Sequence, residues 1–196
     1  MLGLALVIDR FINLKTAKVA PPRLLEEVLR VSQQGIPDGD VVHQLEQNSA
    51  LGEVLASGLH LINKNPQCSE ADLRATMEGS GRRVAQRLEK YLAALATIAS
   101  AAPLMGLFGT VVGMIEIFGS QSPAGGATGG NPAQLAHGIS VALYNTAFGL
   151  IIAIPALIFW RYFRARVDGY LLTLELASEQ LLRQLNGQRN GQRNGP

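Results

Sequence analysis

The chain of 196 residues contains two long apolar stretches, residues 91–118 and 135–163, between amphipathic flanks. Each is longer than the roughly 20 residues that an α-helix needs to cross a bilayer. From Tyr91 to Trp160 the only lysine, arginine, aspartate or glutamate is Glu116, and charged residues make up 16% of the chain. Soluble domains usually carry roughly 25%. The pattern predicts an all-α polytopic membrane protein and excludes a soluble enzyme.

The N-terminal residues 1–14 are predicted to be the inner part of a first transmembrane helix. Met1–Ile8 is apolar but much shorter than a full span, and Asp9 and Arg10 follow it directly. We therefore expect the outer half of this helix to be missing from the chain, which gives three transmembrane helices with the first one truncated. A short amphipathic anchor lying in the membrane interface is the alternative.

Residues 15–90 are predicted to form a cytoplasmic helical region, because apolar residues recur there at helical spacing between charged positions. Ser69 precedes Asp72 by three residues, a capping-box pattern that predicts a helix start and a helix continuing to Glu89. The other expected helices are Pro22–Gln34, Asp40–Gln47 and Ala50–Lys64.

The parts that flank the spans predict the topology. Residues 119–134 form a loop rich in glycine, proline and serine without lysine or arginine, and we expect it to lie in the periplasm. Residues 164–186 continue as an amphipathic cytoplasmic helix, and residues 187–196 are predicted to be a disordered tail. The N-terminus is then outside and the C-terminus inside. The basic flanks are Lys15, Lys18, Arg82, Arg83, Arg87, Lys90, Arg161, Arg164 and Arg166.

Small residues form a stripe along each complete span. Gly106, Thr110 and Gly113 follow one another at i, i+4 and i+7, and Gly109 and Gly113 form a GxxxG pair beside them. Lipid supplies no hydrophobic drive between helices, so small residues that let backbones approach contribute much of the association energy. We therefore expect these glycines to pack helices closely. The second stripe is Ala142, Thr146, Gly149 and Ala153.

The two threonines lie at similar depth. At a rise of 1.5 Å per residue, Thr110 is about 12 Å below the outer end of its span, and Thr146 is roughly 16 Å below the outer end of the other. A hydroxyl can bond a carbonyl of its own helix and still bond another group. With Ser140 and Asn145 nearby in sequence, this predicts a polar lining for an ion pathway, whereas a packing role alone is the alternative.

Each complete span also contains a proline, Pro103 or Pro155. Proline frees the carbonyl one turn back, here that of Ala99 or Ile151, and loosens the helix at that point. Such carbonyls can serve a passing ion or water. A simple hinge or kink is the commoner role.

No aspartate, glutamate, lysine or arginine lies in the middle of either complete span. Glu116 lies near the outer end of the first span, and His137 lies near the outer end of the second. A protein that moves protons through lipid normally needs a titratable group at depth. Either the chain moves no protons or another subunit brings the acid, and hydroxyls and carbonyls can serve H⁺ or Na⁺. The single cysteine, Cys68, excludes an internal disulfide framework and a Cys-rich metal site. The net charge of +2 is small, and we expect no metal, cofactor or nucleic-acid partner.

The segments APLMGLFGTVVGMIEIF and NPAQLAHGISVALYNTAFGLIIAIPALIFWRYF resemble the MotA/TolQ/ExbB proton channel family over residues 89–168, and the ExbB/TolQ branch more than flagellar MotA. The resemblance implies a non-enzymatic subunit of the bacterial inner membrane. It implies a homo-pentamer around an ExbD- or TolR-like partner with one membrane aspartate. Proton motive force would drive work on a TonB- or TolA-like protein, for import across the outer membrane or envelope maintenance. Thr110 and Thr146 match the pore-facing threonines of the family, and Pro155 matches its proline.

The chain departs from the family pattern at Val141, where some ExbB proteins have a glutamate, and in the truncated first span. Three other functions stay open at this point: a flagellar-type stator subunit, a non-conducting oligomeric scaffold, and a small-solute transporter. The transporter is disfavoured because no inverted repeat or buried charged site is visible.

Overall fold

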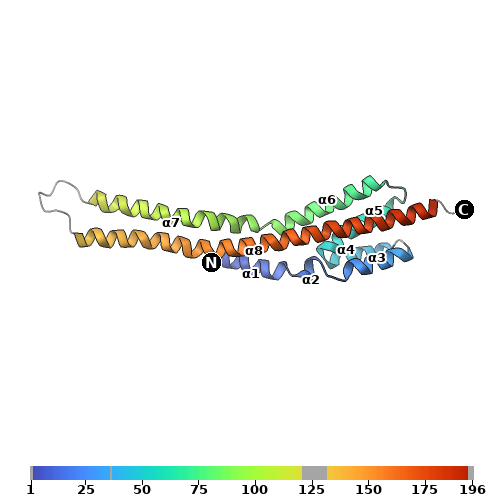
Figure 1. Cartoon of the computed structure of the whole chain (residues 1–196), viewed down its shortest axis with the longest axis horizontal. Helices are drawn as coiled ribbons and strands as arrows, with labels where there is room; N and C mark the ends of the chain where they lie inside the picture. The colour runs from blue at the N-terminus through green and yellow to red at the C-terminus, as the bar shows by residue number, and fades with distance from the viewer. Residues whose placement is uncertain (1, 36, 121–131, 194–196) are drawn as a thin grey trace. The chain divides into compact units, whose positions relative to one another are not determined.

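The computed structural model describes residues 2–35, 37–120 and 132–193 (Figure 1). These residues form α-helices joined by short links, and the described part of the chain contains no strand. The helices are α1 (Leu2–Asn13), α2 (Thr16–Val19), α3 (Leu24–Gln34), α4 (Gly39–Asn48), α5 (Ala50–Lys64), α6 (Glu70–Glu89), α7 (Leu92–Ser120) and α8 (Pro132–Arg193).

The helices divide into two compact units. Unit 1 combines residues 1–6 with residues 92–162, and unit 2 combines residues 7–91 with residues 163–196. Both units are therefore discontinuous in sequence, and α1 and α8 each contribute to both.

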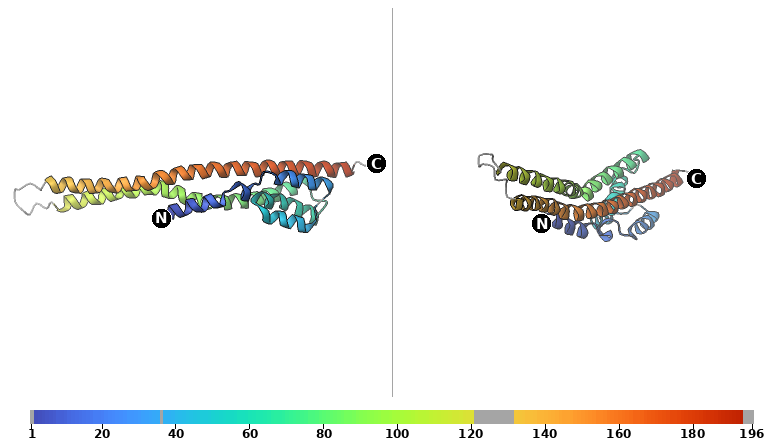
Figure 2. Two further views of the ribbon diagram at one scale, coloured as in Figure 1. Left: turned by 90° about the horizontal axis from the view of Figure 1, so that it is seen from below. Right: turned by 60° about the vertical axis from the view of Figure 1, so that its left-hand side comes forward.

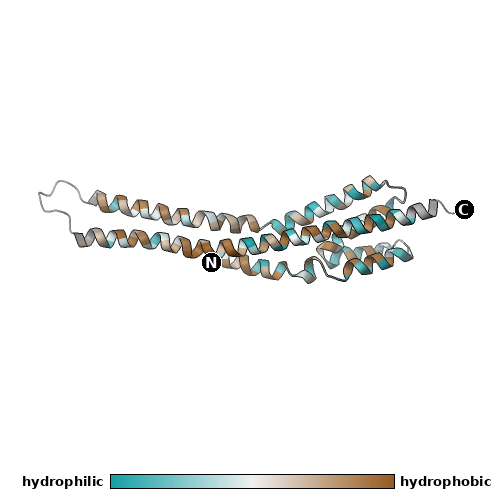
Figure 3. Cartoon of the chain, viewed as in Figure 1, coloured by the Kyte–Doolittle hydropathy of each residue, from teal (hydrophilic) through white to brown (hydrophobic). Residues whose placement is uncertain are grey.

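In unit 1, α7 lies beside the first part of α8, as the views of Figures 1 and 2 agree. Two helical segments, Glu70–Gly119 and Ala136–Gln188, are long and apolar enough to cross a membrane, with mean hydropathies of 1.8 and 2.0 in their most apolar windows. Only 11% and 22% of these windows are buried, so they are not the core of a soluble domain. Figure 3 shows many hydrophobic residues along α7 and the first part of α8, whereas α6 is largely hydrophilic. Large exposed side chains include Leu104, Met105, Phe108, Ile115, Phe148 and Ile151.

Unit 2 buries many of its large apolar side chains, although some, such as Ile8 and Leu172, are exposed. Helix α5 lies at its centre, and Gly58 allows α6 to approach, because a Cβ at Gly58 would fall 2.8 Å from the Met77 sulfur. Gly52 similarly faces the carbonyl oxygen of Leu45 in α4. Aromatic rings also pack here, with Phe11 and Phe163 edge to face at 5.0 Å between centroids. The fully buried side chains include Leu51, Leu55, Leu59, Ile62, Leu73, Met77, Phe163 and Leu181.

Several predicted helices agree with the structure. Helix α5 has the predicted bounds, and α6 starts at the predicted capping box, where the Ser69 hydroxyl accepts from the Asp72 backbone N–H and the Asp72 carboxylate accepts from the Ser69 backbone N–H. Residues 164–186 indeed continue from the second apolar stretch, because α8 is unbroken from Pro132 to Arg193. The short helix α2 has no counterpart in the sequence prediction.

The prediction of a disordered tail over residues 187–196 is wrong for its first seven residues. Helix α8 runs on to Arg193, and residues 194–196 lie outside the described part. Extending a helix that is already nucleated adds one hydrogen bond per residue. In addition, the side-chain amides of Gln184 and Gln188 donate to the carbonyls of Leu29 and Ser32 in α3, at 2.6 and 2.8 Å. These contacts hold this part of α8 against α3.

The prediction of a loop over residues 119–134 is too long at both ends. Helix α7 includes Gly119 and Ser120, and α8 already begins at Pro132. The rest of the predicted loop, residues 121–131, lies outside the described residues.

Candidate ion-pathway site

The backbones of α7 and α8 touch at two buried glycines of unit 1. A Cβ added at Gly106 would fall 2.8 Å from the carbonyl oxygen of Asn145 and 3.0 Å from the Cα of Thr146. A Cβ added at Gly149 would fall 2.7 Å from the carbonyl oxygen of Ala102. Cβ atoms do not approach backbone atoms this closely, so a side chain at either glycine would force the helices apart.

The other glycines of the first stripe meet α8 less tightly. A Cβ at Gly109 would fall 3.0 Å from the side-chain nitrogen of Asn145, so this amide lies over the glycine. A Cβ at Gly113 would make ordinary contact with the Ala142 methyl group, at 3.6 Å. The contact between the helices therefore loosens from Gly106 toward Gly113.

Thr146 lies at this contact, half-buried, with its Cα against Gly106. Thr110 is also half-buried, and its hydroxyl donates to the Leu107 carbonyl at 2.7 Å, three residues back in α7. A hydroxyl that donates in this way keeps its lone pairs for a further donor.

Thr110 additionally lines an open hollow of about 640 Å³ on α7. The other lining residues are apolar, so the Thr110 hydroxyl supplies the polar side-chain group of the hollow. The structure thus places the two threonines in different surroundings, one at the helix contact and one at an apolar hollow. The remaining residues of the hollow are Val111, Met114, Ile115, Phe118 and Gly119.

The other predicted positions are a serine on α8 and one proline inside each of the two helices. Ser140 is exposed, and its hydroxyl donates to the Ala136 carbonyl at 2.9 Å. Pro103 lies half-buried inside α7 and Pro155 lies exposed inside α8, and neither proline ends its helix. Val141, the position of the family's glutamate, is 47% exposed on α8.

The sequence prediction missed two contributors to the helix contact. Ala102 supplies the carbonyl that faces Gly149, and Gly138 lies against the side chain of Ile117. Gly138 precedes Ala142 by four residues, so it could have been found by extending the second stripe one turn toward the start of α8.

The site carries no charge at depth. Between residues 92 and 160 the sequence has one charged side chain, Glu116, which is exposed near the end of α7. Among the described residues, no group of histidine, cysteine, aspartate and glutamate side chains could hold a metal ion. The arrangement offers hydroxyls, one amide and backbone carbonyls, which can bind a hydrogen-bonding partner but cannot carry a proton as a carboxylate does.

Comparison with known proteins gives consistent matches. The sequence profile described as the MotA/TolQ/ExbB proton channel family matches residues 46–176. A biopolymer transport protein of Synechocystis sp. described as ExbB-like is 30% identical over 182 residues, which cover 92% of this chain and 82% of the relative.

Two further relatives are shorter matches with higher identity. The biopolymer transport protein ExbB of Pseudomonas putida is 40% identical over 116 residues, which cover 54% of this chain and 34% of the relative. The Tol-Pal system protein TolQ of Pseudomonas aeruginosa is 38% identical over 130 residues, which cover 63% of this chain and 55% of the relative. The matches therefore cover about a third to a half of these two proteins.

Proposed function

Because the chain belongs to the MotA/TolQ/ExbB proton channel family and resembles its ExbB/TolQ branch, we propose that it is the multi-span subunit of a proton-driven motor in the bacterial inner membrane. Its partner would be an ExbD- or TolR-like subunit with one membrane aspartate. The output would be mechanical work on a TonB- or TolA-like protein, for import or envelope maintenance. A flagellar-type stator is not favoured, because the named relatives are ExbB and TolQ proteins.

One observation carries this proposal. The two apolar helices make a backbone contact at Gly106 and Gly149 with Thr146 at it, and the Thr110 hydroxyl lies in a separate hollow of α7. No aspartate or glutamate lies at depth in either span. A proton cannot be carried across a hydrocarbon layer without a titratable group. A subunit with a polar lining and no carrier fits a partner that contributes the carboxylate.

In the proposed mechanism, Thr110 and Thr146 hydrogen-bond water or the partner's aspartate as its charge changes. A hydroxyl both donates and accepts, so it can serve the ionised and the protonated carboxyl. Protonation removes the cost of exposing the aspartate to an apolar wall. The partner helices can then turn past this wall, and release of the proton on the other side completes the step.

The proposed topology has three spans, with the N-terminus outside and residues 15–90 and 164–186 in the cytoplasm. Support for the first span comes from α1, whose Gly3 faces Ile98 of α7: a Cβ at Gly3 would lie 3.8 Å from the Ile98 Cδ1. Support for the orientation comes from the basic residues at the inner flanks and their absence between α7 and α8. We propose a homo-pentamer, in line with the family.

The test replaces each threonine by valine, which keeps the shape and removes the hydroxyl. The full chain and its partner are reconstituted in liposomes, and proton flux is measured under an imposed gradient. We expect Thr110→Val and Thr146→Val to reduce flux at least about tenfold, because losing one hydrogen bond to a charged group costs about 1.5–3 kcal/mol. Assembly with the partner should persist.

Thr97→Val is the matched control, because the Thr97 hydroxyl also bonds its own helix, donating to the Ala93 carbonyl at 2.9 Å in α7. Its flux should equal that of the unchanged chain. Normal flux in both pathway variants would reject the polar lining. If no assembled complex conducted protons, the second candidate function, a non-conducting scaffold, would be favoured. The tight glycine contact alone would suffice for that function.

A further inference from the structure

Unit 2 contains a cavity of about 380 Å³ where α1, α2 and the end of α6 meet. Its lining includes four cationic side chains from separate segments of the chain. These are Arg10 of α1, Lys18 of α2, Arg87 of α6 and Lys90, which follows α6, with Tyr91 and Asn13 beside them.

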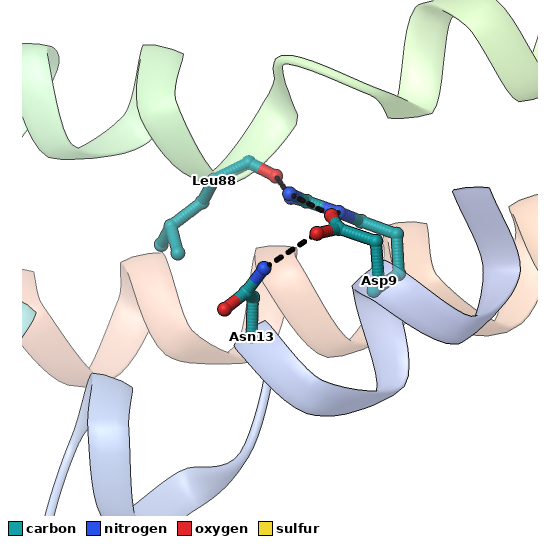
Figure 4. A network of polar contacts seen from close by, with 4 residues as sticks. Asp9, Asn13 and Leu88 are labelled. Atoms are coloured by element: carbon teal, nitrogen blue, oxygen red, sulfur yellow. Dashed lines mark hydrogen bonds and ion pairs between the residues drawn. The ribbon is translucent and has the colours of Figure 1, made fainter. Parts of the chain in front are cut away.

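Arg10 is fixed in place by its neighbours. The side chain is buried, and its guanidinium donates to the Leu88 carbonyl at 3.1 Å and pairs with the Asp9 carboxylate at 2.9 Å. The Asn13 amide donates to the other oxygen of Asp9 at 2.9 Å, and Figure 4 shows Asp9 and Asn13 beside Leu88. The Arg10 guanidinium also lies 4.7 Å from the centre of the Tyr91 ring. This wall of the cavity is therefore preorganised.

The cavity keeps an excess of positive charge. Asp9 pairs with Arg10, and Glu53 pairs with Arg87. Lys18 and Lys90 form no ion pair with any described residue, and both are exposed. The Nζ of Lys90 lies 5.3 Å from the centre of the Tyr91 ring. Two exposed lysines without an ion pair among the described residues thus line the same cavity as a fixed guanidinium, and this cavity is large enough for a phosphate group.

The sequence places this cavity at the edge of an apolar span. Lys90 and Tyr91 directly precede Leu92, where α7 and the uncharged stretch begin. Tyrosine is enriched at the membrane–water interface, and basic pockets beside a span on the cytoplasmic side suit anionic headgroups. Arginine and lysine are also the usual partners of phosphate oxygens.

We propose that this cavity binds the phosphate group of an anionic phospholipid, with the exposed Lys18 and Lys90 and the fixed Arg10 as its partners. The proposal needs the chain to lie in a membrane but does not depend on proton conduction. A free phosphate could supply the same chemistry, and the experiment separates the two sources.

The test uses the full chain in a nonionic detergent, where no charged membrane surface adds a general attraction. Binding of a short-chain phosphatidylglycerol is measured by titration calorimetry and compared with the phosphatidylcholine of equal chain length. We expect phosphatidylglycerol to bind more tightly, and the double variant Lys18→Gln/Lys90→Gln to weaken its binding at least about tenfold, because two charge-assisted contacts to the phosphate are lost.

Lys64→Gln is the matched control, because Lys64 is an exposed lysine of unit 2 outside the cavity and without an ion pair among the described residues. It should bind like the unchanged chain, and so should Lys18→Arg/Lys90→Arg, which keeps both charges. Circular dichroism checks that each variant is folded.

Equal affinity for the two lipids, or no effect of the double glutamine variant, would overturn the proposal. Inorganic phosphate that displaces phosphatidylglycerol at similar concentration would overturn the lipid assignment in favour of a soluble anion.

Discussion

Unit 1 and unit 2 are both built from helices, but the helices of unit 1 meet through small residues and those of unit 2 meet through large apolar ones. In unit 1 the smallest residues meet, with Gly106 against Thr146 and Gly149 against Ala102, while Leu104 and Phe108 are more than half exposed. In unit 2 the large residues meet, and Leu55 and Leu59 are completely buried. This difference in contact residues is the one expected if unit 1 is surrounded by lipid and unit 2 by water.

Water drives large apolar side chains together, because each buried side chain removes apolar area from water. A lipid environment gives no such advantage, so exposed leucines there cost little and close backbone contact provides the association. Hydropathy alone identifies the apolar helices of this chain, whereas the positions of small residues identify the face on which these helices meet.

The largest expected difference between the units comes from truncating a leucine in each. Leu59→Ala should lower the free energy of unfolding by about 2–5 kcal/mol, because it leaves a cavity among fully buried neighbours. Leu104→Ala, at a side chain 65% exposed on α7, should change stability by less than about 0.5 kcal/mol. Denaturant unfolding in detergent, followed by circular dichroism, measures both. Similar losses for the two variants would mean that α7 is packed like the core of unit 2.

The next effect lies within unit 1 and distinguishes two glycines of one stripe. Gly106→Ala should destabilise the α7–α8 pair by about 1–3 kcal/mol, because its methyl group would meet backbone atoms that cannot move separately. Gly113→Ala should stabilise it by up to about 1 kcal/mol, because its methyl group fits at 3.6 Å from Ala142 and alanine favours the helix.

Thermal unfolding in the same detergent gives the sign for each of the two glycine variants. If Gly113→Ala destabilised as much as Gly106→Ala, the contact would not loosen along α7 as described. Equal tolerance of both alanines would instead place the helices farther apart at Gly106.

The smallest effect concerns pH and belongs to unit 2. The hydrogen bond from the Ser69 hydroxyl, followed by that from its backbone N–H, lowers the pKa of the Asp72 carboxyl from its ordinary value of 3.8. A lowered pKa in the folded chain means that the stabilisation is complete above the ordinary pKa and is lost as the pH falls through the lowered one. Asp72→Asn should therefore reduce the acid sensitivity of α6, measured by hydrogen exchange at its first turn.

Glu78→Gln is a suitable control for this pH effect, because Glu78 lies farther along α6 and its contact with Arg82 is a long, exposed one at 4.0 Å. Its acid sensitivity should match that of the unchanged chain. If the pH profile of hydrogen exchange in Asp72→Asn matched that of the unchanged chain, protonation of Asp72 would not be the cause of acid destabilisation of α6.

The sequence was sufficient for features that depend on neighbours in the chain. The capping box at Ser69 predicted the start of α6, and helical spacing predicted α5 with its observed bounds. The two apolar stretches and their small-residue stripes were also visible, because span length and i, i+4, i+7 spacing are local properties. The roles of the threonines in ion movement remain a prediction.

Features that depend on distant partners could not be predicted. The Arg10 guanidinium bonds a carbonyl 78 residues away, and Gln188 bonds one 156 residues away in α3. The sequence predicted only that Arg10 follows the first apolar stretch and that Gln188 belongs to a disordered tail, because periodicity contains no information about which segments meet. The cationic cavity was missed for the same reason, since its side chains come from separate helices.

The discontinuity of unit 2 has a consequence for biosynthesis. Its N-terminal helices leave the ribosome first, but Leu29 and Ser32 of α3 receive hydrogen bonds from Gln184 and Gln188 near the end of α8. Contacts so distant in sequence form late and slowly. We expect α3 to stay incompletely packed until both apolar helices have been inserted and the final turns of α8 have been translated, so that completion of unit 2 reports successful membrane integration.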